Sequence, residues 1–399
     1  MDVQAVRAAF PVLNNSGVIY FDSACTSLKP RPVIDAERSY DEEYSACAGR
    51  SHHPLADRTE AKFEAARARI ARFVNARPDE VVFTKNTTEA LNLVVRSLDY
   101  SSRKAIVTTA LEHHSLLLPI LEQQRRGGAR VEMLGVSAAG EIDASSVDRL
   151  IDRNTALVAI HHTSNTTGMR APLDAIVTRA REQGALVLVD AAQGVPHSRV
   201  DFRKLGVDFL AFSGHKMCGP TGIGCLVGRR KAFETLDTFI VGGGTVETVT
   251  LQKVQWKASP IRFEAGIQNY AGAFGLAAAC DYLSALGMEQ IERHERELAG
   301  ALVEAIQAVP GATLYGTPDP ARRCAVVTFN LKGIPAHQVA LMCHPLAKIA
   351  LRSGVFCAQP AMELLGAPEG AVRASLYFYN TTAEIQTFRD TLQKIARLA

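Results

Sequence analysis

The sequence predicts an α/β protein in which a mainly parallel sheet is followed by a smaller α+β domain. Apolar runs alternate with amphipathic helical stretches along the first 285 residues, which is the pattern of a parallel sheet with crossover helices. The run Ala185-Leu186-Val187-Leu188-Val189 is apolar throughout, as is typical of strands covered on both faces. After residue 285 a long charged helical stretch begins and shorter elements follow, which indicates the second domain.

The individual elements follow from these patterns in chain order. Strands are expected at 81–84, 105–108, 156–161, 185–190 and 209–212, and helices at 61–73, 89–97, 116–126 and 173–182. A helix over 288–309 and a strand over 324–331 open the second domain. We therefore predict a large domain over residues 17–285 and a small domain built from residues 1–16 and 286–399.

Composition excludes several classes of protein. The chain has 399 residues, is 47% hydrophobic and 21% charged, and carries a net charge of +3, which gives no reason to expect nucleic acid as a partner. No run approaches the length of a membrane span, and residues 1–15 do not resemble a signal peptide. Eight scattered cysteines without a CxxC pair suggest free thiols in a reducing compartment. We therefore expect a cytoplasmic protein that does not contact a membrane.

Polar side chains follow each predicted strand of the large domain. In open α/β sheets ligands bind beyond the carboxyl ends of the strands, so these side chains are expected to form one site. They are Asn86, Thr87, Thr88, Glu112, His113, Ser164, Asn165, Asp190, Gln193, Ser213, His215 and Lys216.

The chemistry of this set points to pyridoxal phosphate (PLP). Asn86-Thr87-Thr88 opens a helix, whose free N–H groups and hydroxyls can hold a phosphate. No GxxxxGK(S/T) motif is present, and the glycine-rich turn at 219–224 lacks the context of a dinucleotide site, which excludes a nucleotide fingerprint. Lys216 can form a Schiff base with PLP, and Asp190 can keep its pyridine nitrogen protonated. The histidine pairs lack closed ligand spacing, and we expect no metal.

Eight blocks of sequence carry a resemblance to a known family over nearly the whole chain. In their order and spacing the sequence resembles the SUF-type cysteine desulfurases, a group that includes selenocysteine lyases, within the class V aminotransferase fold. The resemblance implies fold type I of the PLP-dependent transferases, with a seven-stranded sheet and a homodimer. The blocks are YFDSACTS (20–27), TTEA (87–90), EHH (112–114), SNTTG (164–168), DAAQ (190–193), SGHK (213–216), RFEAG (262–266) and RSGVFC (352–357).

The resemblance also implies roles for particular residues. Lys216 would hold the cofactor and shuttle a proton, and Cys357, on a loop of the small domain, would attack the sulfur of L-cysteine. The persulfide on Cys357 would pass to a sulfur-acceptor protein, with L-alanine as the other product. The cofactor ring would contact Asp190, Gln193 and His113, its phosphate would contact Thr87, Thr88, Ser213 and His215, and the substrate carboxylate would contact Asn165, Arg352 and Arg373.

Other readings stay open at this stage. A PLP-dependent carbon–sulfur β-lyase, or a selenocysteine lyase, could use the same cofactor site, and the β-lyase would need no nucleophilic thiol. A cofactor-binding scaffold without activity is a third reading. Cys25 and Cys47 add thiols near the expected site, and together with Cys357 they could be redox partners or cluster ligands. Ile267 stands where the family has a threonine.

Overall fold

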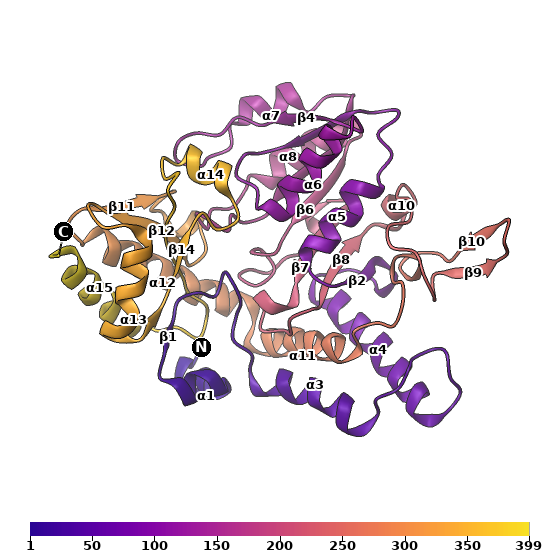
Figure 1. Cartoon of the computed structure of the whole chain (residues 1–399), viewed down its shortest axis with the longest axis horizontal. Helices are drawn as coiled ribbons and strands as arrows, with labels where there is room; N and C mark the ends of the chain where they lie inside the picture. The colour runs from indigo at the N-terminus through magenta and orange to yellow at the C-terminus, as the bar shows by residue number, and fades with distance from the viewer. Residues whose placement is uncertain (399) are drawn as a thin grey trace.

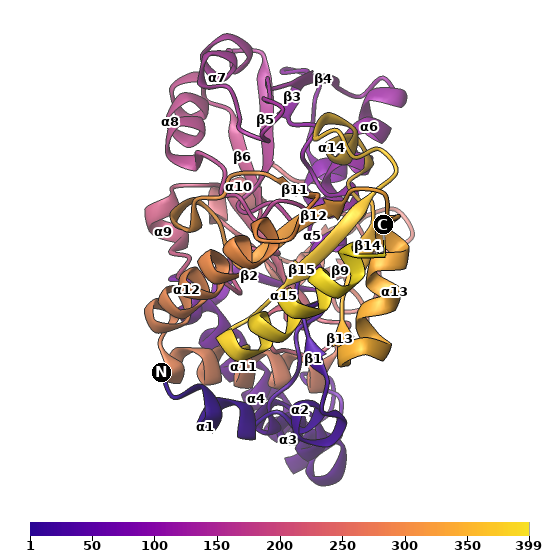
Figure 2. The ribbon, with the colours of Figure 1, turned by 90° about the vertical axis from the view of Figure 1, so that its left-hand side faces the viewer.

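The computed structural model describes residues 1–398, and its centre is a seven-stranded sheet (Figures 1 and 2). The strands lie in the order β2-β8-β7-β6-β5-β3-β4, in which β8 is antiparallel to both neighbours and every other neighbouring pair is parallel. The predicted α/β class with a mainly parallel sheet is confirmed. The strands are β2 (Val81–Thr84), β3 (Ala105–Thr108), β4 (Arg130–Met133), β5 (Thr155–His161), β6 (Leu186–Asp190), β7 (Phe209–Ser213) and β8 (Gly224–Gly228).

Helices cover both faces of this sheet, because its central strands are apolar on both faces. Along β2, Val81 and Phe83 join the core formed with α3, α4, α8 and α11, whereas Val82 joins the core formed with α5 and α6. This alternation is the period of two of a strand. The helices are α3 (Arg31–Glu43), α4 (Pro54–Phe73), α5 (Thr87–Ser97), α6 (His114–Arg125), α7 (Ala144–Leu150), α8 (Leu173–Gln183), α9 (Phe202–Leu205), α10 (Arg230–Phe233) and α11 (Tyr270–Leu286).

A four-stranded antiparallel sheet in the order β11-β12-β15-β14 forms the C-terminal layer. It shares a separate apolar core with α12, α13 and α15. These elements all lie after residue 285, and we propose to keep the domain division predicted above. They are α12 (Met288–Gln307), β11 (Ala312–Tyr315), β12 (Val326–Leu331), α13 (Ala336–Ala347), β14 (Arg352–Gly354), α14 (Gln359–Leu364), β15 (Ala371–Ser375) and α15 (Thr382–Ala396).

The N-terminal helices pack against the segment that follows β15. Phe10, between α1 (Val3–Ala8) and α2 (Pro11–Ser16), is fully buried, and its ring centroid lies 4.9 Å from that of Tyr379. A short parallel pair of strands, β1 (Ile19–Tyr20) and β13 (Ile349–Ala350), continues this contact. The first 20 residues therefore pack against the C-terminal part of the chain.

A hairpin of two antiparallel strands projects from the body of the molecule (Figure 1). It consists of β9 (Val246–Val249) and β10 (Val254–Trp256), and we call residues 246–256 the arm. No single helix within residues 1–398 is long and apolar enough to cross a membrane; α11 and α12 reach that composition only as a pair, which is bent by 77°.

The predicted elements are present, but some bounds differ. The helix expected at 61–73 begins at Pro54, because the side chain of His53 accepts a hydrogen bond from Ala56 N and proline suits the first helical position. The sequence patterns did not predict strands β4 and β8. β4 is a partly exposed edge strand, and β8 begins and ends with glycine, so neither presents a clear strand pattern.

Candidate active site

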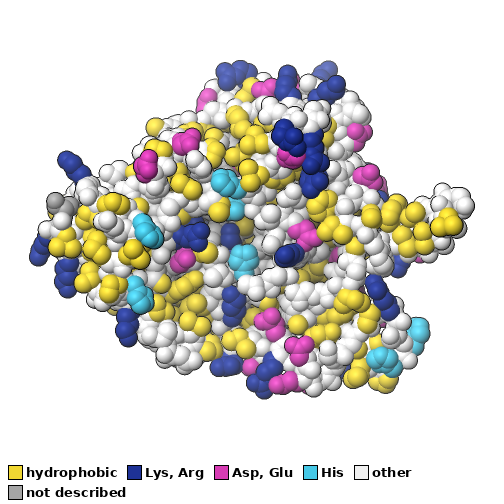
Figure 3. All heavy atoms as spheres, in the orientation of Figure 1, with side chains coloured by type: hydrophobic (Ala, Val, Ile, Leu, Met, Phe, Trp, Pro, Cys, Tyr) yellow, Lys and Arg dark blue, Asp and Glu magenta, His cyan; other side chains and the backbone are white. Residues whose placement is uncertain are grey.

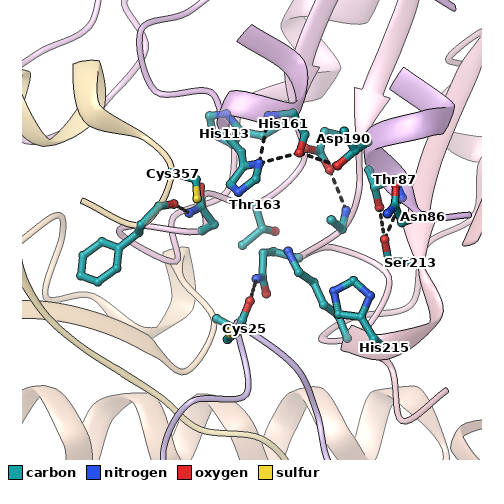
Figure 4. Close-up of a pocket in the computed structure, with 18 of the residues that line it drawn as sticks. Cys25, Asn86, Thr87, His113, His161, Thr163, Asp190, Ser213, His215 and Cys357 are labelled. Carbon is teal, nitrogen blue, oxygen red and sulfur yellow. Dashed lines mark hydrogen bonds between the residues drawn. The ribbon is translucent and has the colours of Figure 1, made fainter. Parts of the chain in front are cut away.

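One pocket lies at the carboxyl ends of the parallel strands, between the large sheet and the C-terminal layer (Figure 4). Its wall comes from the segments that follow β2, β3, β5, β6 and β7, and from β14, β15 and the loop after β14. The pocket brings together most of the site residues predicted from the sequence, whereas Glu112 and Ser164, which were also expected there, do not line it. The residues that line it are Thr87, Thr88, His113, Asn165, Asp190, Gln193, Ser213, His215, Lys216, Arg352, Cys357 and Arg373.

The first turn of α5 forms one end of the pocket. Asn86 caps the helix by accepting a hydrogen bond from Glu89 N, and Ser213 Oγ accepts from Thr87 N at 2.8 Å. A Cβ at position 224 would lie 2.8 Å from Cα of Asn86, so only glycine lets β8 run this close to the helix start. The turn therefore presents a helix N-terminus and hydroxyl groups to the pocket, which is a setting that suits a phosphate.

Lys216 and Asp190 end neighbouring strands and face the same cavity. Lys216 lies in the 3-10 turn after β7. Within residues 1–398, no hydrogen bond contributes to the pKa of its amine. Burial lowers the pKa of Lys216, against the opposing effect of Asp190. Burial raises the pKa of Asp190, while the N–H of Ala192, 2.9 Å from its Oδ1, and the charge of Lys216 lower it. An amine of lowered pKa is suited to nucleophilic and proton-transfer chemistry.

His113 is a neutral imidazole with a defined tautomer. It is the N-cap of α6, and its Nδ1 accepts a hydrogen bond from Ser115 N at 3.1 Å. Burial and the nearby Lys216 lower the pKa of His113 to about 3. Its single ring proton is therefore on Nε2 at neutral pH. Burial and Lys216 likewise lower the pKa of His215 to about 4.

Two arginines lie side by side on the C-terminal layer. Arg352 on β14 is the register partner of Arg373 on β15. Arg373 donates through Nη1 to Asn165 O at 3.0 Å and through Nη2 to Asp22 Oδ1 at 3.3 Å, whereas its buried Nε has no partner within residues 1–398. Like charges placed opposite each other on a sheet are unfavourable, and a carboxylate between them relieves the repulsion.

Cys357 is exposed on a loop that is anchored on both sides. His114 N donates to Cys357 O at 2.7 Å, and Asn165 Nδ2 donates to Phe356 O at 2.9 Å. The ring of Phe356 is buried, and the Arg373 guanidinium lies 5.0 Å from its centroid. Phe356 and Cys357 both adopt positive φ, at 54° and 53°. Such backbone is costly for residues other than glycine, and it persists here because these contacts hold it.

All eight cysteines are unpaired, and they differ in access. Cys25 lines the pocket and accepts a hydrogen bond from Arg352 Nη1 at 3.5 Å, whereas Cys47 is half-buried and does not line it. Residues 1–398 contain no group of three or more His, Cys, Asp or Glu side chains that could hold a metal ion. The buried thiols are Cys218, Cys225, Cys280, Cys324 and Cys343.

The predicted set omitted several residues that line the pocket. Ser115 Oγ lies 2.7 Å from Thr88 Oγ1 and 2.9 Å from His113 Nδ1, so it joins two predicted residues. His161 ends β5 and is bonded to the buried Glu112 through Nδ1 at 2.9 Å. The strand-end rule could have found His161, but Ser115 is the second residue of helix α6 and has no local signal.

The RFEAG segment (262–266) lies outside the pocket and is structural. Glu264 is buried and forms a two-pronged ion pair with Arg67, with Oε1 2.6 Å from Nη1 and Oε2 2.9 Å from Nη2. The same carboxylate accepts a hydrogen bond from Phe83 N at 2.7 Å. The motif therefore fixes the loop after the arm to α4 and β2. Ile267, directly after it, is 59% exposed.

The fold and the pocket together define a class of protein. A lysine amine of lowered pKa, a buried carboxylate at the neighbouring strand end and a helix N-terminus suit the aldehyde, ring nitrogen and phosphate of PLP. On a mainly parallel seven-stranded sheet, these features define the PLP-dependent enzymes of fold type I.

Comparison with known proteins gives the family. The family model described as aminotransferase class-V matches residues 19–388, and the chain belongs to this family. PLP is therefore its cofactor. A "Probable cysteine desulfurase" of Streptomyces coelicolor is 40% identical over 408 residues, covering 99% of this chain and 97% of the relative. A "Cysteine desulfurase" of Cronobacter sakazakii is 38% identical, with 99% and 98% covered.

Solved structures agree with the sequence relatives. The apo structure of a cysteine desulfurase from Thermococcus onnurineus matches with a TM-score of 0.95 and 38% identity, covering 99% of this chain and 98% of that one. A cysteine desulfurase from Escherichia coli matches with a TM-score of 0.92 and 32% identity, covering 100% and 99%. The similarity therefore extends over both layers of the fold.

Proposed function

We propose that the chain is a PLP-dependent cysteine desulfurase, which converts L-cysteine to L-alanine and leaves the sulfur as a persulfide on Cys357. One observation carries the proposal: a single pocket holds a lysine amine of lowered pKa, two arginines in register and an accessible thiol on an anchored loop. Relatives that carry the name cysteine desulfurase over nearly their whole length support the same activity.

The cofactor is assigned to the strand-end residues. Bound PLP withdraws electrons from the Cα of the substrate. Lys216 is the attachment residue and holds the proton that moves at Cα, and Thr87 orients Ser213 through the hydrogen bonds between them. Asp190 would hold the ring nitrogen, Gln193 the ring hydroxyl and His113 the ring face, and Thr88, Ser213 and His215 would hold the phosphate.

The substrate carboxylate is assigned to Arg352, Arg373 and Asn165. Arg373 lines the pocket, and a planar guanidinium matches a carboxylate in two hydrogen bonds. This position directs the other end of the substrate toward the loop of Cys357. The thiolate of Cys357 then attacks the substrate sulfur: the S–S bond forms, the Cβ–S bond breaks, its electron pair stays on Cβ, and a proton added there completes L-alanine.

A homodimer is the proposed assembly. The arm projects from the body with apolar side chains on its surface (Figure 3), and Leu251 at its tip is 100% exposed. Val249 is 64% exposed, and Ile267 beside the base of the arm is 59% exposed. Exposed apolar side chains gathered on one projection favour burial against a second copy. Light scattering of Leu251→Glu should show a shift from dimer toward monomer, whereas Leu118→Glu, on the exposed side of α6, should leave the mass unchanged.

The sulfur on Cys357 has to leave the enzyme, and we propose a protein acceptor in a reducing cytoplasm. The thiol lies at the molecular surface, where a second protein can reach it. The eight unpaired cysteines fit a reducing compartment. Persulfide sulfur handed to a protein thiol could serve iron–sulfur cluster assembly.

A product assay tests the activity directly. Purified protein is incubated with L-cysteine and a reductant, and alanine, sulfide and pyruvate are measured together. We expect equal amounts of alanine and sulfide. Cys357→Ser should lose the formation of both products, whereas the matched variant Cys343→Ser, which removes a buried thiol that does not line the pocket, should retain it. Pyruvate equal to sulfide, with full turnover in Cys357→Ser, would instead establish a carbon–sulfur β-lyase. Replacing L-cysteine by selenocysteine in the same assay tests whether the chain is instead a selenocysteine lyase.

A further inference from the structure

The amide of Gln193 is hydrogen bonded at both ends, and both partners are buried. Its Nε2 donates to Ala24 O at 2.8 Å, and its Oε1 lies 3.2 Å from Nε2 of His197. The exposed fractions are 2% for Gln193 and 4% for His197. Because water has so little access, the polar atoms of these groups must satisfy one another.

The direction of each hydrogen bond follows from one fixed point. The carbonyl oxygen of Ala24 can only accept, so the Gln193 atom that faces it is the amide nitrogen. The atom that faces His197 is then the carbonyl oxygen of the Gln193 side chain. That oxygen can also only accept, so Nε2 of His197 carries a proton and donates it.

Glu295 holds the other side of the His197 ring. Its Oε2 lies 2.7 Å from Nδ1 of His197, and the carboxyl group is 2% exposed. Whichever of these two atoms holds the proton between them, Nδ1 is satisfied and the ring presents its Nε2–H to Gln193. Tyr377 packs edge-on against the imidazole, with the ring centroids 5.1 Å apart, and this contact restricts the ring plane.

We propose that Glu295 and His197 are positioning residues that fix the amide of Gln193, so that its second N–H is left for an oxygen of the bound cofactor. The nitrogen has two hydrogens, and Ala24 uses one of them. Gln193 lines the pocket, whereas His197 and Glu295 do not. The inference rests on the proposed function for the place of the cofactor ring beside Gln193.

The hydrogen-bonded series Ala24, Gln193, His197 and Glu295, which we call the relay, joins the two layers of the molecule. Gln193 and His197 follow β6 of the large sheet, and Glu295 comes from α12 of the C-terminal layer. At the other end, Ser375 Oγ on β15 accepts a hydrogen bond from Ala24 N at 3.0 Å. Both ends of the relay are therefore anchored in the C-terminal layer. Loss of the Glu295 hydrogen bond to His197 should then change how the cofactor is held, although α12 does not line the pocket.

Three variants test the relay. His197→Phe keeps a ring against Tyr377 but removes the Nε2–H donor. Glu295→Gln removes the charge but keeps a group that can donate to or accept from Nδ1. His294→Phe is the matched control, because His294 directly precedes Glu295 in α12 and bonds Asn380 O at 3.0 Å without reaching Gln193. The measurements are the Kd for PLP added to apoprotein, the absorption spectrum of the bound cofactor, and the melting temperature.

The relay predicts a specific pattern. His197→Phe should weaken PLP binding by about tenfold and shift the absorption band, because the Gln193 oxygen loses the His197 donor and the amide becomes free to turn. Glu295→Gln should stay within about twofold of the unchanged protein, by the same hydrogen-bond argument. His294→Phe should lower the melting temperature and leave the Kd and the spectrum unchanged.

Other outcomes overturn the relay. It is refuted if folded His197→Phe keeps the Kd and spectrum of the unchanged protein, if His294→Phe changes them equally, or if Glu295→Gln loses as much affinity as His197→Phe. If His197→Phe does not fold, Glu295→Leu replaces it, since leucine leaves Nδ1 unpartnered and the tautomer unfixed; equal affinities in Glu295→Leu and Glu295→Gln would then refute the relay. Failure of the unchanged protein to bind PLP would count against the proposed function instead.

Discussion

Arg373→Lys separates the shape of the arginine fork from its charge. The guanidinium already serves three protein groups: Nη1 donates to Asn165 O, Nη2 donates to Asp22 Oδ1, and the plane lies over the Phe356 ring. Lysine keeps one positive charge but presents a single ammonium on a flexible stem. It therefore cannot hold Asn165 and Asp22 and also bind a carboxylate in two hydrogen bonds.

The size of the effect follows from the hydrogen bonds lost. If lysine keeps one of the two hydrogen bonds to the substrate carboxylate, the loss is one hydrogen bond to a charged group, about 1.5–3 kcal/mol. That free energy corresponds to a KM raised by about 10- to 150-fold. The melting temperature should fall by a few degrees as well, because Arg373 is 3% exposed and two of its contacts join different segments.

Steady-state production of alanine from L-cysteine measures the change, with the melting temperature as a check on folding. Arg352→Lys serves as the comparison, because the recorded side-chain contact of Arg352 is with Cys25 Sγ at 3.5 Å and its replacement disturbs less of the wall. We expect the KM to rise more for Arg373→Lys than for Arg352→Lys. A folded Arg373→Lys enzyme whose KM stays within twofold would show that the fork does not hold the substrate.

Three further predictions concern the thiols, the buried ion pair and the pH dependence of stability. Mass spectrometry after a single turnover should find the added sulfur on Cys357 and none on Cys25, and Cys25→Ala should retain alanine formation; sulfur found on Cys25 would contradict the assignment. Arg67→Met should destabilise the fold by about 3–5 kcal/mol in urea unfolding, because it leaves the Glu264 carboxylate buried and unpaired, and a change below about 1 kcal/mol would contradict this. The pKa of His113 is about 3 in the folded protein and about 6.5 in the unfolded chain, so between these pH values the folded protein binds fewer protons and its stability falls as the pH is lowered from 6.5. Melting curves of the apoprotein at several pH values should show a shallower loss of stability for His113→Asn. An unchanged slope would refute the assignment.

The site was largely readable before the structure because of where parallel strands end. Asp190 and Lys216 follow two strands whose apolar patterns are local and strong, and the carboxyl ends of neighbouring parallel strands share one edge of a sheet. Two strands of the same sheet, β4 and β8, were not predicted from the sequence. The side chains of β4, at the sheet edge, are exposed or only partly buried, and β8 begins and ends with glycine, so neither strand shows a clear period of two.

Contacts between distant segments had no such signal. Arg352 and Arg373 were both candidates for the substrate carboxylate, but only the antiparallel register of β14 with β15 makes them neighbours. The same holds for Glu295, which reads in the sequence as one more charge on an amphipathic helix and is in fact buried against His197. Register and layer packing depend on the whole chain, and a local pattern of period 2 or 3.6 does not encode them.

The sequence by itself determined the α/β class, the strand-end site, the cofactor and the reactive lysine, because each of these follows from a local pattern or from the order of the motifs along the chain. The tertiary structure alone decided which residues support them: Ser115 between Thr88 and His113, the pairing of the two arginines, the anchoring of the Cys357 loop by Asn165, and the relay behind Gln193. The physical reason is that a hydrogen bond needs its two atoms within about 3 Å, and only the packing of the two layers brings such distant segments that close.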